Sequence, residues 1–246
     1  MAVSAEVMAM EREEDAQVKR FDVHQMVQHA GLMVSFILLV VTGLPQKFSE
    51  VGFSQWWISV LGGIETTMDV HHFSAWVMVV VCVYHALYLV ITIAILKRPF
   101  PIKMVPGTQD VVNIFNEIRY FVGMTNQRPQ FDRFNWREKF DYWAIFWGVP
   151  IMAGSGFVLM FPVFVTKYVP GWVVPTALVA HSDEAMLAIT WIMIVHVFFN
   201  HFVPGLFPLN KSIFTGKVPL HRFITDHPVE YEEMIKTGKI DIEKEK

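Results

Sequence analysis

Long runs without a charged side chain dominate the pattern of hydrophobic and polar positions. No Asp, Glu, Lys or Arg occurs in residues 23–46, 70–96, 142–166 or 185–210. Each run exceeds the roughly 20 residues that a helix needs to cross a hydrocarbon core of about 30 Å. A run such as residues 77–83 also lacks the polar face that a helix of a soluble bundle would show. The pattern therefore predicts four membrane-spanning helices, at about residues 24–45, 70–96, 142–164 and 180–203.

Composition supports a membrane protein. Hydrophobic residues make up 53% of the chain and charged residues only 17%, compared with about 25% charged residues in soluble domains. We therefore predict an all-α fold, an integral membrane four-helix bundle that forms one domain over residues 1–246. Residues 208–246 would be a soluble C-terminal tail. Nothing in this composition points to nucleic acid as a partner.

The distribution of basic residues predicts the orientation of the bundle, because short cytoplasmic loops collect Lys and Arg. Lys47 and Lys167 are the basic residues of the first and third loops. The second loop carries eight, namely Lys97, Arg98, Lys103, Arg119, Arg128, Arg133, Arg137 and Lys139. Both termini are therefore predicted to be cytoplasmic. The first twenty residues are polar, so we expect no cleaved signal peptide.

Histidines within the apolar segments are the candidate functional residues. His71 and His85 are 14 residues apart and His181 and His196 are 15 apart, which on a helix corresponds to about 21 to 23 Å along one broad face. His29 lies in the first segment. Because histidine is costly inside a membrane unless it is paired or ligates something, a functional role is the default interpretation. Two facing helices of this kind would hold two haems, one above the other.

The ligand types restrict the cofactor. Cys82 is the single cysteine, whereas a c-type haem needs a C-x-x-C-H motif and an iron–sulfur cluster usually needs four thiolates. Zinc or non-haem iron would need a compact group of ligands, and histidines 14 residues apart cannot share an ion. Haem b held between neutral imidazoles is the remaining fit. The chain has no phosphate-binding loop and no activated nucleophile, so we predict no catalytic residue of its own.

Topology predicts which histidines meet. The second and fourth spans run in the same direction, so His71 and His181 both lie near the outer surface and would hold the outer haem. His196 lies near the inner surface, where His85 and His29 are both at a suitable depth. Spacing alone leaves these two open. His201 is about 200° around the helix from His181, which favours a polar interface role.

Several motifs resemble the membrane cytochrome b subunit of respiratory formate dehydrogenases and nickel–iron hydrogenases over nearly the whole chain. The matching residues are Lys19-Arg20-Phe21 before His29, Thr42-Gly43 after it, Asn135 to Lys139, His181 and His196, Phe214-Thr215-Gly216-Lys217 and His227-Pro228. The resemblance implies a prokaryotic inner-membrane protein. It also implies partnership with an iron–sulfur or multihaem subunit and with a separate catalytic subunit.

The same resemblance implies specific roles for residues. His71 and His181 would hold the outer haem, and His29 and His196 the inner haem. Asn135 would contact menaquinone or ubiquinone beside the inner haem, although Arg137 stands where the family has a glycine.

A second resemblance gives a different inner ligand. The stretch from Val70 to Ala75, together with His85, is similar to the second helix of cytochrome b in quinol-oxidising bc-type complexes. That pattern would use His85 for the inner haem. A third haem between His29 and His201, with His85 on His196, is a further alternative.

A membrane transporter and a structural anchor are the two rival functions. A transporter would more often pair membrane histidines with buried acids, and a purely structural anchor would need no histidine.

The segments outside the spans also have predicted positions. Residues 48–61 are predicted to lie at the outer membrane interface. Residues 111–122 are predicted to lie at the inner interface, as an amphipathic helix that lipid or a partner subunit would cover. Asp183 and Glu184 are expected to cap the start of the fourth span with Ser182. A short helix is expected from Asp226 to near Gly238.

Overall fold

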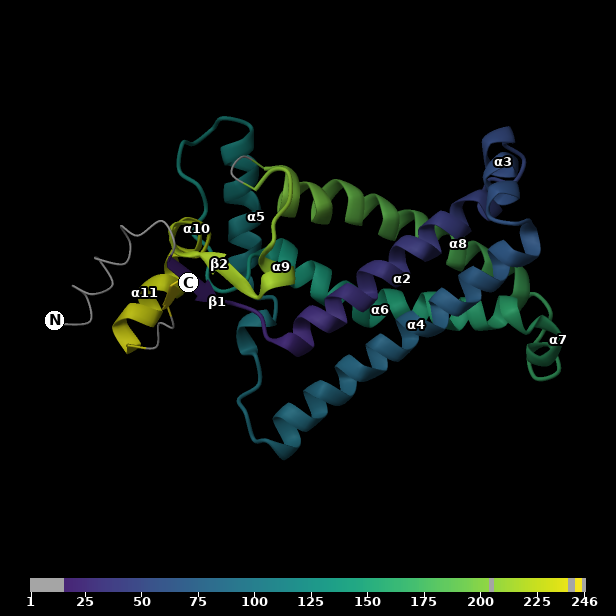
Figure 1. Ribbon diagram of the computed structural model, residues 1–246, viewed down its shortest axis with the longest axis horizontal. Helices are drawn as coiled ribbons and strands as arrows, with labels where there is room; N and C mark the ends of the chain where they lie inside the picture. The colour runs from purple at the N-terminus through teal and green to yellow at the C-terminus, as the bar shows by residue number, and fades with distance from the viewer. Residues whose placement is uncertain (1–15, 204–205, 239–241, 245–246) are drawn as a thin grey trace. The chain divides into compact units, whose positions relative to one another are not determined.

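Four long helices dominate the structure (Figure 1), a computed structural model that describes residues 16–203, 206–238 and 242–244. Helices α2 (Val23–Lys47) and α6 (Trp136–Met160) are uninterrupted, whereas α4 (Ile64–Val90) and α8 (Val173–Trp191) continue into the π-helical segments η1 (Ile91–Ile95) and η3 (Ile192–Phe202). All four are long and apolar enough to cross a membrane. The predicted helical membrane protein with four spans is confirmed.

The boundaries of three spans differ from the prediction by several residues. Span two begins at Ile64 instead of near residue 70, and span three begins at Trp136 instead of near residue 142. Span three ends at Met160, because Pro162 begins a separate short helix, α7 (Pro162–Val165). Span four begins at Val173 instead of near residue 180. The predicted helix-start cap at Ser182 is therefore wrong: Ser182 lies inside α8 and its hydroxyl donates to the Val179 carbonyl (3.3 Å). Asp183 projects from α8, and its carboxylate lies 3.7 Å from the Lys47 ammonium.

Contacts between Cα atoms divide the chain into two compact units, of which one comprises residues 27–99 and 144–199 and contains most of the four spans. Its burial pattern is the reverse of a soluble bundle. Large apolar side chains point outward, as for Val80, which is 65% exposed, whereas the fully buried positions on the spans carry small hydroxyl side chains: Ser35, Thr42, Thr67 and Ser74. Each of these hydroxyls donates to a backbone carbonyl one turn earlier. An apolar exterior and small polar interior residues are what lipid as solvent favours.

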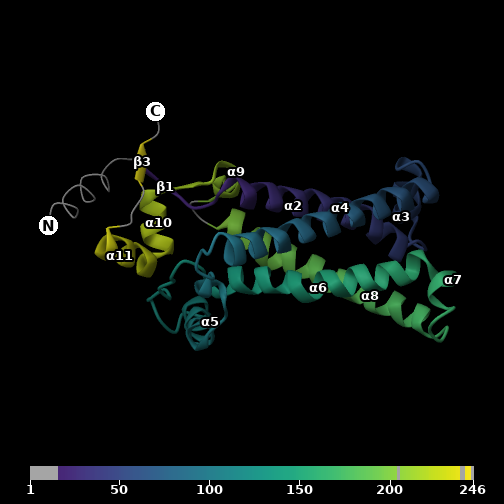
Figure 2. The ribbon, with the colours of Figure 1, turned by 90° about the horizontal axis from the view of Figure 1, so that it is seen from below.

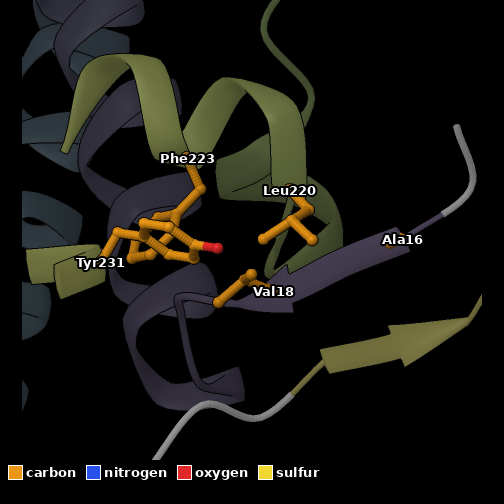
Figure 3. Packing of buried hydrophobic residues seen from close by; sticks show 5 residues of the cluster. All are labelled: Ala16, Val18, Leu220, Phe223 and Tyr231. Carbon is orange, nitrogen blue, oxygen red and sulfur yellow. The ribbon is translucent and has the colours of Figure 1, made fainter. Parts of the chain in front are cut away.

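The second unit, which includes residues 100–143 and the described residues of both terminal segments, contains a small antiparallel sheet in the order β2-β1-β3. The strands are β1 (Ala16–Lys19), β2 (Lys217–Pro219) and β3 (Ile242–Lys244), and Val18 pairs with Val218 on one side and Ile242 on the other. Helices α10 (Leu220–Asp226) and α11 (Pro228–Thr237) follow β2. The hydrophobic core of this unit is formed by Ala16, Val18, Leu220, Phe223 and Tyr231 (Figure 3). The prediction of a helix ending near Gly238 is confirmed.

A buried ion-pair network holds α11 in this unit. Glu230 is only 4% exposed, and its two oxygens pair with Arg20 at 2.9 Å and Arg133 at 2.6 Å. Arg20 also donates to the Arg133 carbonyl. Burial lowers the pKa of His227, and the nearby Arg20 charge lowers it further. The neutral ring donates from Nδ1 to the Asp132 carbonyl at 2.8 Å. The start of α11 is therefore fixed by both charge and hydrogen bonding.

Shorter helices complete the fold. The first loop contains α3 (Gly52–Val60), where residues 48–61 were expected at an interface. The second loop contains η2 (Ile102–Met104) and α5 (Thr108–Phe121), so the helix expected around residues 111–122 is present. Helix α9 (Ser212–Thr215) precedes β2. Residues 1–15, on which the expectation of an uncleaved N-terminus mainly rests, lie outside the described residues.

Candidate haem-binding site

Two pairs of histidine rings lie close together between the spanning helices. The rings of His71 on α4 and His181 on α8 have centroids 6.2 Å apart. Those of His29 on α2 and His196 in η3 are 6.1 Å apart. All four residues belong to the same compact unit. Each span except α6 therefore contributes at least one ring to a pair.

The separation within each pair matches two imidazoles that ligate one iron. Metal–nitrogen bonds to histidine are about 2.0 Å long and the ring nitrogen lies about 1.1 Å from the ring centre, which gives centroids about 6.2 Å apart. Direct packing of two aromatic rings also gives 4.5 to 7 Å, so the distance agrees with haem ligation without requiring it. The hydrogen bonds to each ring provide a second test.

Thr42 fixes the tautomer of His71. Its Oγ1 donates to the Leu38 carbonyl at 2.7 Å and lies 2.9 Å from His71 Nδ1. Because the single hydroxyl proton is used by the carbonyl, the oxygen accepts a hydrogen bond from Nδ1–H. The lone pair of His71 is then on Nε2, the atom that an axial ligand uses. Hydrogen bonding of the other ring nitrogen is the usual way in which metal-ligating histidines are oriented.

Ser155 on α6 repeats this arrangement at His181. Its Oγ donates to the Ile151 carbonyl at 2.6 Å and lies 3.0 Å from His181 Nδ1. A glycine follows each hydroxyl residue, and a Cβ atom at Gly43 or Gly156 would lie 3.1 or 3.2 Å from Cε1 of the neighbouring ring. The α2–α4 and α6–α8 pairs therefore hold their histidines in the same way, with glycine allowing the ring to approach the opposite backbone.

His85 has a different environment. Its Nδ1 lies 2.8 Å from Gln28 Oε1, and its ring contacts that of Phe146 with centroids 6.3 Å apart. Gln28 is only 5% exposed, and its Nε2 has no hydrogen-bond partner among the described residues. His29 and His196, not His85 and His196, form the ring pair at the iron-ligating separation. A buried amide donor beside His29 is a place where a bound group would supply the acceptor.

His201 was a candidate ligand of a third haem, together with His29, and its hydrogen bond bears on that alternative. The backbone N–H of Asn210 donates to His201 Nδ1 at 3.1 Å. A neutral imidazole with Nδ1 as the acceptor carries its proton on Nε2. In this tautomer Nε2 has no free lone pair to offer to iron. In His71 and His181, by contrast, the free lone pair is on Nε2.

Asn135 caps the start of α6. Its Oδ1 accepts from the backbone N–H groups of Arg137 and Glu138, both at 3.0 Å, and Glu138 Oε2 accepts from the Asn135 N–H at 2.8 Å. This is a reciprocal capping box. Glu138 follows Asn135 by three residues, and this spacing is the sequence signature by which the capping box could have been predicted. The cap occupies Oδ1 and does not involve the amide Nδ2.

Over the part of the chain that the structure describes, no cluster of three or more His, Cys, Asp or Glu side chains would hold a bare metal ion. Axial ligation of a flat macrocycle by paired imidazoles fits these residues.

Four apolar helices with two pairs of histidine rings between them are typical of a membrane cytochrome b. A family model described as prokaryotic cytochrome b561 matches residues 20–216, and the chain belongs to this family. It is therefore a b-type haem protein of membrane electron transfer. A search of curated proteins finds no significant match.

We predict that removing the hydroxyls shifts a haem reduction potential. A hydrogen bond from Nδ1–H makes the imidazole a stronger donor and favours ferric iron. Thr42→Val or Ser155→Ala should raise one midpoint potential by up to about 40 mV, equivalent to ~1 kcal/mol for one electron. Redox titration of the α-band absorbance measures this. Ser35→Ala is the control, since the Ser35 hydroxyl contacts backbone carbonyls only; equal shifts in all three variants would exclude a specific effect.

Proposed function

We propose that this chain carries electrons across the membrane between a partner redox subunit at the outer face and the quinone pool, through two b haems. The observation that carries the proposal is the presence of two histidine pairs with centroids 6.2 and 6.1 Å apart in one helical unit. Each pair provides the two axial ligands of one haem iron. For a transporter with non-haem histidines the two separations would be those of directly packed rings, which haem analysis of the purified protein distinguishes.

His71 and His181 are the proposed ligands of one haem, and His29 and His196 those of the other. Each haem, when bound, supplies an iron that changes between the ferric and ferrous states by one electron. Thr42 and Ser155 hold the first two rings in the tautomer that presents Nε2. Gly43 and Gly156 allow these rings to lie against the opposite helix. His85 supports Gln28 and is not a ligand in this proposal.

The direction of the path follows from the loop charges. Six basic residues lie between η1 and α6, and Arg137 and Lys139 follow at the start of α6. By the positive-inside rule this concentration supports a cytoplasmic position for the loop. The His71–His181 haem is then near the outer face, where an iron–sulfur or multihaem subunit would dock, and the His29–His196 haem is near the cytoplasmic face. A separate catalytic subunit would carry the substrate chemistry.

Quinone exchange at the inner haem would make turnover electrogenic, because electrons cross the membrane while protons stay on the cytoplasmic side. Each charge moved is worth about 2.3 kcal/mol per 100 mV. We expect liposomes with trapped ferricyanide and external menaquinol or ubiquinol to develop a membrane potential. The potential would come from those protein molecules whose quinone side faces the external solution. The potential should collapse with valinomycin and potassium and be absent with the His181→Ala protein. Ferricyanide reduction without any potential would contradict the proposal.

Asn135 is the proposed quinone contact, and its cap role can be separated from that contact. Asn135→Asp keeps the oxygen that caps α6 but removes the amide Nδ2–H that would donate to a quinone carbonyl. We predict a fold unchanged in stability and a roughly tenfold higher KM for quinone, about the loss of one hydrogen bond. Asn135→Ala, which also costs the helix about 1 kcal/mol, is the comparison. If Asn135→Asp reduces quinone normally, Asn135 is a cap and nothing more.

A further inference from the structure

Helix α5 has its polar and apolar faces reversed relative to a helix on a soluble surface. Asp110, Asn113 and Glu117 are each only 7% exposed. The opposite face carries large apolar side chains that are more than half exposed: Val111 (54%), Phe115 (64%), Ile118 (52%) and Val122 (63%). Their spacing of three and four residues forms one stripe along the helix. Water is therefore a poor environment for the outward face of α5.

The polar face of α5 is attached to the first turns of α6. Lys139 pairs with Asp110 at 2.8 Å, and Arg137 pairs with Glu117. Trp136 Nε1 also donates to Glu117 Oε2 at 2.7 Å. The charged side chains of both pairs are at most 14% exposed. These contacts hold α5 beside the beginning of a spanning helix (Figure 2).

The residues at the beginning of α6 indicate the depth of that contact. Trp136, Tyr142 and Trp143 all lie within its first eight residues, and Trp143 Nε1 donates to the Met104 carbonyl at 2.9 Å. Indole and phenol rings concentrate at the headgroup level of a membrane. Because Trp136 is hydrogen-bonded to Glu117, helix α5 lies at the same depth in the membrane as these three aromatic side chains.

We propose that the apolar face of α5 lies in the lipid headgroup and acyl boundary of the leaflet at the start of α6. The proposal depends on the membrane span and not on haem or quinone. Arg119, within α5, and Arg128, just beyond its end, are exposed, and lipid phosphates match their charge. An interfacial helix typically places its apolar face 5 to 10 Å into this boundary. Because α5 is attached to the first turn of a spanning helix, a soluble partner would have to cover this face within the headgroup layer.

Site-specific fluorescence in liposomes tests this surface. Phe115→Cys and Ile118→Cys, made in a Cys82→Ala background and labelled with an NBD dye, report on the apolar face. Gln109→Cys is the matched control, since Gln109 is exposed on the polar side of the same helix. The protein is reconstituted in phosphatidylcholine and phosphatidylglycerol with or without brominated acyl chains. We expect brominated lipid to quench the labels at positions 115 and 118 at least threefold more than the label at 109, and aqueous iodide to show the reverse order.

Iodide quenching at positions 115 and 118 as strong as at 109 would overturn the proposal and leave a protein partner as the occupant. Protection from both quenchers would also overturn it, since a second copy of the chain would then cover the face. The haem absorbance and monodispersity of each labelled protein show that the fold is retained. Because the readout does not involve electron transfer, its failure is distinguishable from a failure of the proposed function.

Discussion

Alanine at His181 should halve the haem content of the chain and stop electron flow across the membrane. The His71–His181 rings, with centroids 6.2 Å apart, form the pair in which both tautomers are fixed by hydroxyl oxygens. Without His181 the haem of this pair would lose one of its two axial ligands, whereas the His29–His196 pair is unaltered. Haem assay and quinol-driven ferricyanide reduction in liposomes measure the two effects.

His72→Ala is the matched control for this variant. His72 follows His71 on the same span, so its removal changes the number of membrane histidines without breaking either ring pair. It should leave haem content and electron flow unchanged. Equal losses in His72→Ala and His181→Ala would mean that the effects come from the bundle as a whole and not from axial ligation.

Alanine at Glu230 should destabilise the unit that contains the three-stranded sheet by about 3 to 5 kcal/mol, the range for removing one partner of a buried ion pair. The side chains of Arg20 and Glu230 are each 5% exposed. Without the carboxylate, the Arg20 guanidinium would remain buried without an anion, and Arg133 would lose the same partner. Amide hydrogen exchange of β1 and α11 should become faster by a factor of a hundred or more, the equivalent of that energy.

Two variants make this result specific. Glu230→Gln keeps an oxygen acceptor and should cost less than Glu230→Ala, since only the charge is lost. Glu232→Ala removes a surface pair with Lys236, in which the two side chains are 73% and 67% exposed, and should cost less than about 0.5 kcal/mol. Glu230→Ala as mild as Glu232→Ala would show that the Arg20 network contributes little to the stability of this unit.

The parts of the fold that the sequence predicts are those with a long, local signal. Each span is a charge-free run longer than a bilayer needs, and its histidines stand out against that background. Val173 as the start of α8 was missed because Asp183 and Glu184 suggested a helix start, although two acids in the first half of a 30-residue span do not prevent a helix from forming. The three strands were missed because segments of three or four residues show no periodicity. Their pairing also joins residues 200 positions apart.

Residues around the histidines were harder to predict for a different reason. Thr42 and Ser155 are ordinary small residues of a span until the ring beside each is known. A hydroxyl followed by glycine inside an apolar run was the available signal, at Thr42-Gly43 and again at Ser155-Gly156. The choice between His29 and His85 depends on the phase of helix α8, and the wider π-helical turn that holds His196 changes that phase from the regular helix assumed for the spacing. The ligand set, the orientation and the single-domain organisation stay predictions.

The number of b haems per polypeptide, measured by pyridine haemochrome on the purified chain and on its His29→Ala and His85→Ala variants, tests this account most directly. We predict two haems in the unaltered chain, one after His29→Ala and two after His85→Ala. A loss with His85→Ala alone would assign the inner haem to His85, and a ratio of three would require a further ligand pair. A chain that binds no haem would contradict the account and favour a transporter.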